Sequence, residues 1–164
     1  MRNILITGGA GFIGSNFVRY VLLNQPDVFI VNLDLLTYAG SQENLKELPS
    51  PDRYEFVKGD ICDQAMVEEI LRRHEIDTIV HFAAETHVDR SIYGPAAFVQ
   101  TNIFGTFSLL EATRKVWLDE NMLDPRTVRF HHISTDEVFG SLAADAPAFD
   151  EKTPYSPNSP YAAS

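Results

Sequence analysis

Five short apolar segments, separated by helical patterns, constrain the fold of this chain most strongly. The segments lie at residues 3–7, 28–33, 54–57, 78–82 and 128–134. The first and fourth are almost continuously apolar, as is typical of strands in a parallel sheet covered on both faces. Helical patterns occupy residues 13–24, residues 63–74 with Asp63 as N-cap, and residues 95–119 with Pro95 in the first turn. This alternation predicts an α/β fold with a doubly wound parallel sheet, which binds its ligands at the carboxyl ends of the strands.

Size and composition narrow the class of protein. The chain has 164 residues, enough for one domain with its own core. Its net charge of −10 disfavours nucleic acid and anionic membranes as partners. Cys62 is the only cysteine, so no internal disulfide can form, and residues 1–9 lack the apolar run of a signal peptide or membrane span. We therefore predict a cytoplasmic protein.

The loop after the first predicted strand reads TGGAGFIG. Gly8, Gly11 and Gly14 fit a G-x-x-G-x-x-G pattern, and Gly9 with the last two also fits G-x-G-x-x-G. Glycines at this spacing permit a tight turn and let a pyrophosphate approach the amino end of the following helix. The alternative is a glycine-rich turn that binds no ligand.

Asp34 ends the second predicted strand, 20 residues after Gly14. A carboxylate at this position accepts hydrogen bonds from the adenosine ribose and repels a 2′-phosphate. The next basic residue is Lys46, so NAD is favoured over NADP as the cofactor. The glycine turn and Asp34 together predict a Rossmann-type NAD-binding domain.

Seven segments of the chain carry a family resemblance: ILITGGAGFIGSNFV, LDLLTYAG, GDICD, HFAAETHVDRSI, GPAAFVQTNIFGT, HHISTDEVFG and SPYAAS. Together they resemble the extended short-chain dehydrogenase/reductase family, and its sugar-nucleotide 4,6-dehydratases in particular. STDEV followed by Phe-Gly is the most specific segment, because epimerases of the same family usually lack its acidic pair. The resemblance implies an NAD-dependent lyase that converts dTDP-glucose to dTDP-4-keto-6-deoxyglucose.

The resemblance also assigns residues to the cofactor and the sugar. The NAD contacts that it implies are Gly8, Gly11, Phe12, Ile13, Gly14, Asp34, Leu35, Thr37, Gly40, Asp60, Ile61, Ala83, Ala84 and Thr101. Thr86 and His87 would approach the sugar. Each has a simpler alternative, since the alanines could be small core residues and a single loop histidine is more often structural than catalytic.

The catalytic roles that the resemblance implies fall on Thr135, Asp136, Glu137 and Tyr161. Tyr161 would deprotonate the 4-hydroxyl of the sugar, and Thr135 would hold the C4 oxygen. Glu137 would take the C5 proton and Asp136 would protonate the departing C6 hydroxyl. Two adjacent loop carboxylates are otherwise most often solvated acids.

A metal is not expected. His131 and His132 are adjacent in a predicted strand, so their side chains point to opposite faces and cannot share one ion.

The last segment begins a Tyr-x-x-x-Lys pattern at Tyr161 whose lysine would occupy position 165. We therefore expect residues 1–164 to be the NAD-binding, N-terminal part of a longer enzyme, with the sheet incomplete at its C-terminal end and the substrate-binding part absent. The chain alone is then expected to be inactive. The long helix carries apolar residues around more than one face, and the resemblance implies a homodimer formed by it and by the helix that begins at Tyr161. Two alternatives stay open: a UDP-sugar 4,6-dehydratase, or an NAD-binding module without catalysis.

Overall fold

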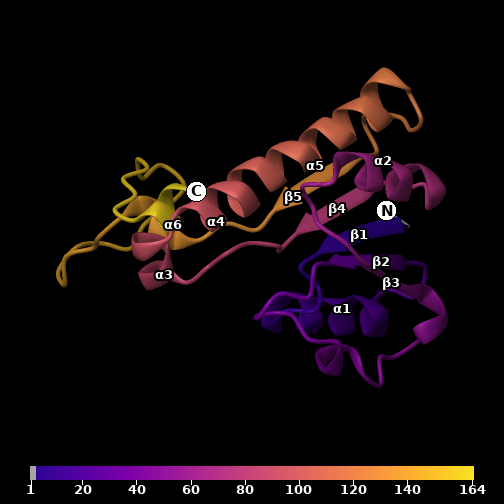
Figure 1. Cartoon of the computed structure of the whole chain (residues 1–164), viewed down its shortest axis with the longest axis horizontal. Coiled ribbons are helices and arrows are strands. Elements are labelled where there is room, and N and C mark those ends of the chain that lie inside the picture. The colour runs from indigo at the N-terminus through magenta and orange to yellow at the C-terminus, as the bar shows by residue number, and fades with distance from the viewer. Residues whose placement is uncertain (1–2) are drawn as a thin grey trace.

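The structure, a computed structural model, describes residues 3–164 and contains a five-stranded parallel sheet (Figure 1). The strands are β1 (Asn3–Thr7), β2 (Phe29–Asp34), β3 (Tyr54–Lys58), β4 (Thr78–His81) and β5 (Arg129–His132), in the spatial order β3-β2-β1-β4-β5. The chain winds outward from β1 to β3, then returns to place β4 beside β1. The strand order therefore reverses between β1 and β4, where a doubly wound sheet forms its ligand crevice. The predicted fold and its five strands are confirmed.

Helices connect the strands as the sequence predicts. Helix α1 (Phe12–Asn24) follows β1, and α2 (Gln64–Arg73) follows β3. The Asp63 carboxylate accepts the Met66 N–H at 3.0 Å, which confirms the predicted N-cap.

The predicted long helix is one continuous rod with three changes of helical type (Figure 1). It contains α4 (Ala96–Phe98), a π-helical segment (Val99–Gly105), α5 (Thr106–Thr113) and a second π-helical segment (Arg114–Asp119). The short α3 (Val88–Tyr93) precedes it and was not predicted. Helix α6 (Pro160–Ala163) contains Tyr161, and Ser159 caps it by accepting the Ala162 N–H at 3.0 Å. Short 3₁₀ turns occupy Gln42–Leu45, Pro51–Arg53 and Asp136–Phe139.

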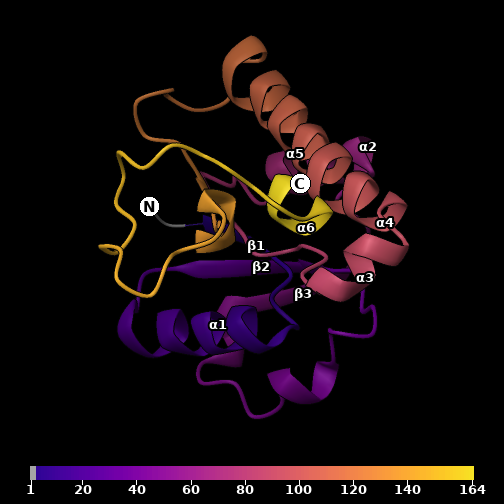
Figure 2. The ribbon, with the colours of Figure 1, turned by 90° about the vertical axis from the view of Figure 1, so that its left-hand side faces the viewer.

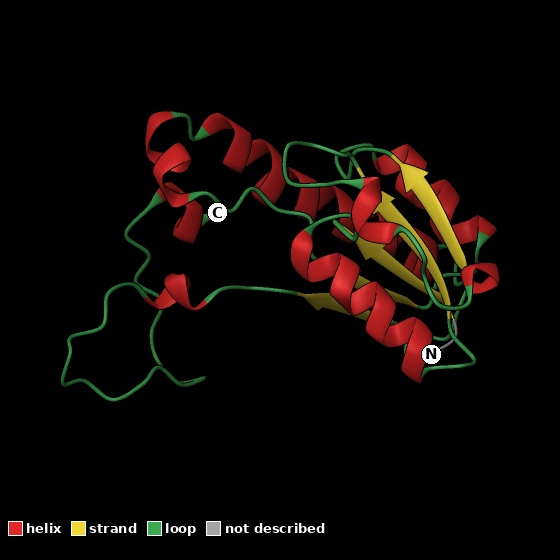
Figure 3. Cartoon of the chain, turned by 90° about the horizontal axis from the view of Figure 1, so that it is seen from below, coloured by secondary structure: helices red, strands yellow, loops and turns green. Residues whose placement is uncertain are grey.

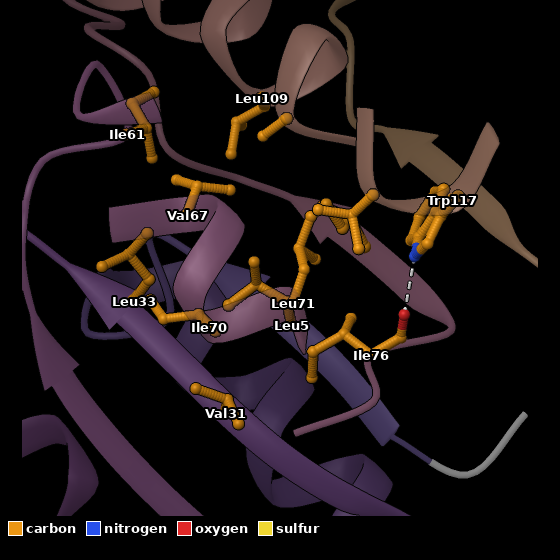
Figure 4. Packing of buried hydrophobic residues seen from close by; sticks show 13 residues of the cluster. Leu5, Val31, Leu33, Ile61, Val67, Ile70, Leu71, Ile76, Leu109 and Trp117 are labelled. Atoms are coloured by element: carbon orange, nitrogen blue, oxygen red, sulfur yellow. Dashed lines mark hydrogen bonds between the residues drawn. The ribbon is translucent and has the colours of Figure 1, made fainter. Parts of the chain in front are cut away.

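One face of the sheet is covered by α2 and the long helix (Figure 4). Buried side chains of β1, β2 and β4 meet apolar side chains of both helices in a single cluster. Its members are Leu5, Val31, Leu33, Ile61, Val67, Ile70, Leu71, Ile76, Ile79, Leu109, Ala112, Val116 and Trp117. The indole N–H of Trp117 donates to the Ile76 carbonyl oxygen at 2.8 Å, so the largest ring in this core has its polar atom paired.

Helix α1 covers the opposite face (Figure 1). Ile4 and Ile6 of β1 point to this side, whereas Leu5 between them points to the other, as the two-residue period of a strand requires. Val18, Val21 and Leu22 of α1 pack on them. The central strands β1, β2 and β4 are therefore buried at nearly every position, whereas the edge strand β5 is largely exposed.

The tail after Gly140 projects away from the strands (Figures 2 and 3). The Phe139 ring packs at a tilt against the rings of Phe149 and Tyr155, with its centroid 5.1 Å and 5.7 Å from theirs. The tail returns to the body at α6, which packs against α3 beside the start of the long helix (Figure 2). Within residues 3–164, every helix is too short or too polar to cross a membrane.

The expected spread of apolar residues around the long helix is confirmed. Leu109, Val116 and Trp117 are buried against the sheet. Four others remain exposed on the outer side, namely Ile103, Phe104, Phe107 and Leu110. We call these four residues the outer apolar face.

Candidate active site

A cavity of about 830 Å³ lies at the carboxyl ends of the strands. Loops that follow β1, β2, β3, β4 and β5 all line it, and α6 closes one side. It therefore occupies the crevice that the reversal of strand order predicts.

Three glycines of the turn, Gly8, Gly9 and Gly14, have no room for a side chain. Gly8 has a φ of +71°, and a Cβ there would lie 2.6 Å from the Ala83 nitrogen. A Cβ on Gly14 would overlap the Gly8 carbonyl oxygen. Gly9 instead packs against the Asn32 side chain and does not line the cavity. The G-x-x-G-x-x-G reading thus describes the cavity better than the G-x-G-x-x-G reading.

The amino end of α1 faces this cavity without a side-chain cap. Gly11 is the N-cap residue, and the first turn contains no acidic side chain. Phe12, Ile13 and Gly14 of that turn line the cavity. The backbone N–H groups of a first helical turn have no partner within the helix and carry a partial positive charge. This end of the cavity can therefore receive an anion.

Asp34 is fixed at the end of β2 with only 8% of its surface exposed. Its two carboxylate oxygens accept the N–H groups of Ala10 and Leu36, each at 2.8 Å. Each carboxylate oxygen can accept a further hydrogen bond, so Asp34 can still bind hydroxyl groups from the cavity.

His81, at the end of β4, also lines the cavity although it is only 2% exposed. Its Nδ1 lies 2.6 Å from the Thr7 hydroxyl and its Nε2 lies 3.0 Å from the Thr106 hydroxyl. Burial, aided by the nearby His132, lowers the pKa of His81 to about 3. The imidazole is therefore neutral near pH 7, and it ties β1 and β4 to α5.

Most of the predicted site residues meet in this cavity. All fourteen predicted NAD contacts line it, as do Thr86, Thr135 and Tyr161. His87 does not, because it is the exposed N-cap residue of α3. Asp136 and Glu137 also lie outside the lining, in the 3₁₀ turn that begins after Thr135. The Thr135 hydroxyl accepts the Glu137 N–H at 3.3 Å, so the acidic pair directly adjoins the cavity wall.

Comparison with known proteins fits this geometry. A family model described as GDP-mannose 4,6 dehydratase matches residues 5–164. The chain belongs to the GDP-mannose 4,6-dehydratase family. The similarity runs from within β1 to the end of the chain, including the tail with α6.

Individual relatives in this family are similar along the whole chain. The dTDP-glucose 4,6-dehydratase of Haemophilus influenzae is 52% identical over 164 residues, which are 100% of this chain and 48% of that protein. The enzyme of the same name from Neisseria meningitidis is 51% identical over 100% of this chain and 46% of its own length. The chain thus spans about half the length of the curated relatives that it matches.

Solved structures show the same relationship. The dTDP-glucose 4,6-dehydratase of Streptomyces venezuelae, crystallised with NAD bound, is 46% identical with a TM-score of 0.85, over 98% of this chain and 47% of that one. The UDP-Glc/GlcNAc 4-epimerase of Campylobacter jejuni is 30% identical with a TM-score of 0.83, over 99% of this chain and 45% of that one. A Rossmann-type domain is therefore shared by dehydratases and epimerases.

The structure adds Asn102 to the cavity wall, a residue that the sequence reasoning missed. It lies in the first π-helical segment and is only 9% exposed. Its Oδ1 accepts the Glu85 N–H at 2.8 Å, and its Nδ2 donates to the Glu85 carbonyl oxygen and the Ser164 hydroxyl, both at 2.9 Å. No local signal marked it, because Gln100 and Thr101 beside it in the same helix are polar as well. Irregular π-helical turns often occur at functional sites.

No group of three or more His, Cys, Asp or Glu side chains within residues 3–164 is arranged to hold a metal ion.

Proposed function

We propose that this chain forms the NAD-binding domain of an enzyme that dehydrates a nucleotide-activated hexose, converting dTDP-glucose to dTDP-4-keto-6-deoxyglucose. The observation that carries the proposal is the cavity, which joins a glycine turn and Asp34 at one end to Thr135 and Tyr161 at the other. The relatives named dTDP-glucose 4,6-dehydratase support the substrate, and the NAD-bound relative supports the cofactor.

The residues present fit NAD. A side chain on Gly8 or Gly14 would collide with neighbouring backbone, and the uncapped end of α1 suits a pyrophosphate. Asp34 would bind the adenosine ribose. Ala83, Ala84 and Thr101, near the carboxyl end of β4, would lie along the nicotinamide half of the cofactor.

Bound NAD would supply a hydride acceptor for C4 of the sugar and a hydride donor for C6. Tyr161 would take the proton from the 4-hydroxyl of the sugar. Thr135 would donate a hydrogen bond to the C4 oxygen and stabilise the negative charge that develops there. Both side chains lie on the cavity wall, as these roles require.

Glu137 and Asp136 would carry out the elimination. The ketone at C4 acidifies the C5 proton, which Glu137 would remove as general base. Asp136 would protonate the C6 hydroxyl as it leaves. Their position directly after Thr135 supports these roles, because their turn adjoins the wall beside the reacting carbons. Thr86 would contact the sugar, and we retain His87 as a sugar contact on the resemblance alone.

Titration calorimetry of this chain with NAD⁺ and NADP⁺ tests the cofactor assignment. We expect NAD⁺ to bind well and NADP⁺ poorly, because the Asp34 carboxylate repels a 2′-phosphate. Asp34→Asn removes the charge, together with one of the two backbone hydrogen bonds that the carboxylate accepts, so the preference for NAD⁺ should fall by about tenfold, the equivalent of 1.4 kcal/mol. Asp27→Asn, at an exposed position before β2, is the control and should retain the preference. Equal affinities for the two cofactors in the unchanged chain would contradict the assignment.

A second test concerns the acid and base, in a chain of the relatives' length that contains these 164 residues. Glu137→Gln should slow product formation by about 10²–10⁴ while the first hydride transfer continues, so that reduced nicotinamide accumulates and is visible by its absorbance. Uptake of deuterium at C5 should fall in parallel. Asp136→Asn should keep the C5 exchange and slow the loss of the C6 hydroxyl. Full turnover in both variants would contradict these roles and would mean that the acidic pair is only solvated.

We also propose that the outer apolar face forms a homodimer interface. Its four side chains are between 45% and 54% exposed, and burying such a patch between two copies would be favourable. Phe104→Glu should shift the sedimentation of a dimeric enzyme toward the monomer, whereas Tyr20→Glu on α1 should not. A cytoplasmic location is proposed only from the single cysteine, Cys62.

A further inference from the structure

Two loops on opposite sides of the glycine turn are joined by side chains outside the predicted site. One loop follows β2 and contributes Leu35, Thr37, Ala39 and Gly40 to the cavity wall. The other follows β4 and contributes the residues from Phe82 to Thr86. Since β1 lies between β2 and β4 in the sheet, any bond between these loops spans the carboxyl end of β1 and the glycine turn after it.

Tyr38 makes that connection. Its hydroxyl donates to a Glu85 carboxylate oxygen (Oε2) at 2.9 Å. The guanidinium carbon of Arg90, on α3, lies 4.4 Å from the centre of the Tyr38 ring, within the range of a cation–π interaction. Tyr38 is 58% exposed, so its ring is held by these two contacts more than by core packing.

The β4 side of this bridge is anchored. The buried side chain of Asn102 binds both the N–H and the carbonyl oxygen of Glu85. Partial burial first, and then the Glu85 carboxylate, raise the pKa of Tyr38. The hydroxyl therefore keeps its proton near pH 7 and remains a donor.

We propose that Tyr38, Glu85 and Arg90 form a clasp across the mouth of the cavity that slows both the binding and the release of the dinucleotide. This inference rests on the proposed function, in which the hydride removed from the sugar is returned to it. Such an enzyme cannot complete its reaction if the reduced cofactor leaves before it returns the hydride to the sugar. A closed bridge over the pyrophosphate region opposes that loss without touching the reacting carbons.

Stopped-flow fluorescence of NADH binding and displacement tests the clasp in this chain. Tyr38→Phe removes the bond to Glu85 and keeps the ring beneath Arg90. Because a hydrogen bond contributes about 0.5–1.5 kcal/mol net, we expect both the association and the dissociation rate constants to rise by about two- to tenfold. The dissociation constant should change by less than about twofold, since opening a gate speeds both directions alike. Arg90→Met should raise both rate constants as well, by a smaller factor.

The control is Tyr20→Phe on α1, where the tyrosine is 60% exposed and lies outside the cavity lining. It should leave both rate constants unchanged. If Tyr38→Phe weakens affinity without changing the association rate, Tyr38 is an ordinary ligand contact and the clasp is refuted. Unchanged rates in a Tyr38→Phe chain that binds NADH would refute the clasp alone. Failure of the unchanged chain to bind NADH would overturn the proposed function and the clasp together.

Discussion

Mild acid should destabilise this fold through the buried imidazole of His81. The pKa of His81 is lowered to about 3 in the folded chain, first by burial and then by His132. In the unfolded chain it returns to about 6.5. Between these values the unfolded state binds one more proton than the folded state, so stability falls as the pH falls. The slope is about 1.4 kcal/mol per pH unit, and the loss by about pH 5 amounts to about 2 kcal/mol.

Urea unfolding at several pH values between about 5 and 7.5 measures this loss. His81→Gln should flatten the dependence by about 2 kcal/mol over that interval, whatever its effect at neutral pH. Glu68 does not interfere, because Lys115 holds the pKa of its carboxyl down to about 2 and its contribution is lost only below the unfolded value near 4.5. His132→Gln is the control. The pKa of His132 is also lowered, but this side chain is exposed, so most of the dependence should remain.

Two results would refute this reasoning. The first is an equal pH dependence in the unchanged chain and His81→Gln. The second applies even if the variant does not fold: nuclear magnetic resonance of the unchanged chain should show the His81 ring remaining neutral down to about pH 4. A ring that titrates near 6.5 would mean that burial does not exclude its charged form.

Two further predictions concern stability and are measured by urea unfolding at neutral pH. Gly8→Ala should lower the free energy of unfolding by at least about 1 kcal/mol, because φ is +71° and the added Cβ would collide with Ala83. The control Gly94→Ala, whose added Cβ would lie 3.8 Å from its nearest heavy atom, should change it by less than about 1 kcal/mol. Equal effects would contradict the steric argument. Trp117→Phe should cost about 1–3 kcal/mol, because the buried Ile76 carbonyl oxygen loses its indole donor at 2.8 Å. An unchanged free energy of unfolding would show that this oxygen finds another donor.

The sequence predicted the sheet well because its signals were local. The central strands β1 and β4 are short apolar runs buried on both faces, so hydrophobicity marked them most clearly. The edge strand β5 (Arg129–His132) is polar and largely exposed, so its signal was weaker. The cap at Asp63 follows from its residue type and position. The short α3 lacks a full apolar period, so hydrophobic periodicity did not reveal it. The π-helical turns depend on backbone bonding that side-chain patterns do not reveal.

The candidate site was also predicted best where the signal was local. Residues directly after a strand were placed correctly in the cavity, because parallel strands bring their carboxyl ends to one edge. His87, Asp136 and Glu137 lie slightly further along their loops, where a local turn decides the direction of each side chain. The hydrogen bond between Tyr38 and Glu85 joins residues 47 positions apart, so no local sequence pattern predicts it.

The long helix holds both the end of β4 and the loop that follows it. Thr106 binds His81, which ends β4, and Asn102 binds both backbone groups of Glu85, four residues further along the same loop. The two helix residues are four positions apart across the end of the π-helical segment Val99–Gly105. A regular α-helix would rotate Asn102 relative to Thr106, because a π-turn holds more residues than the usual 3.6. The irregular segment therefore sets the angle at which one helix holds both the rigid end of the strand and the loop that anchors the clasp.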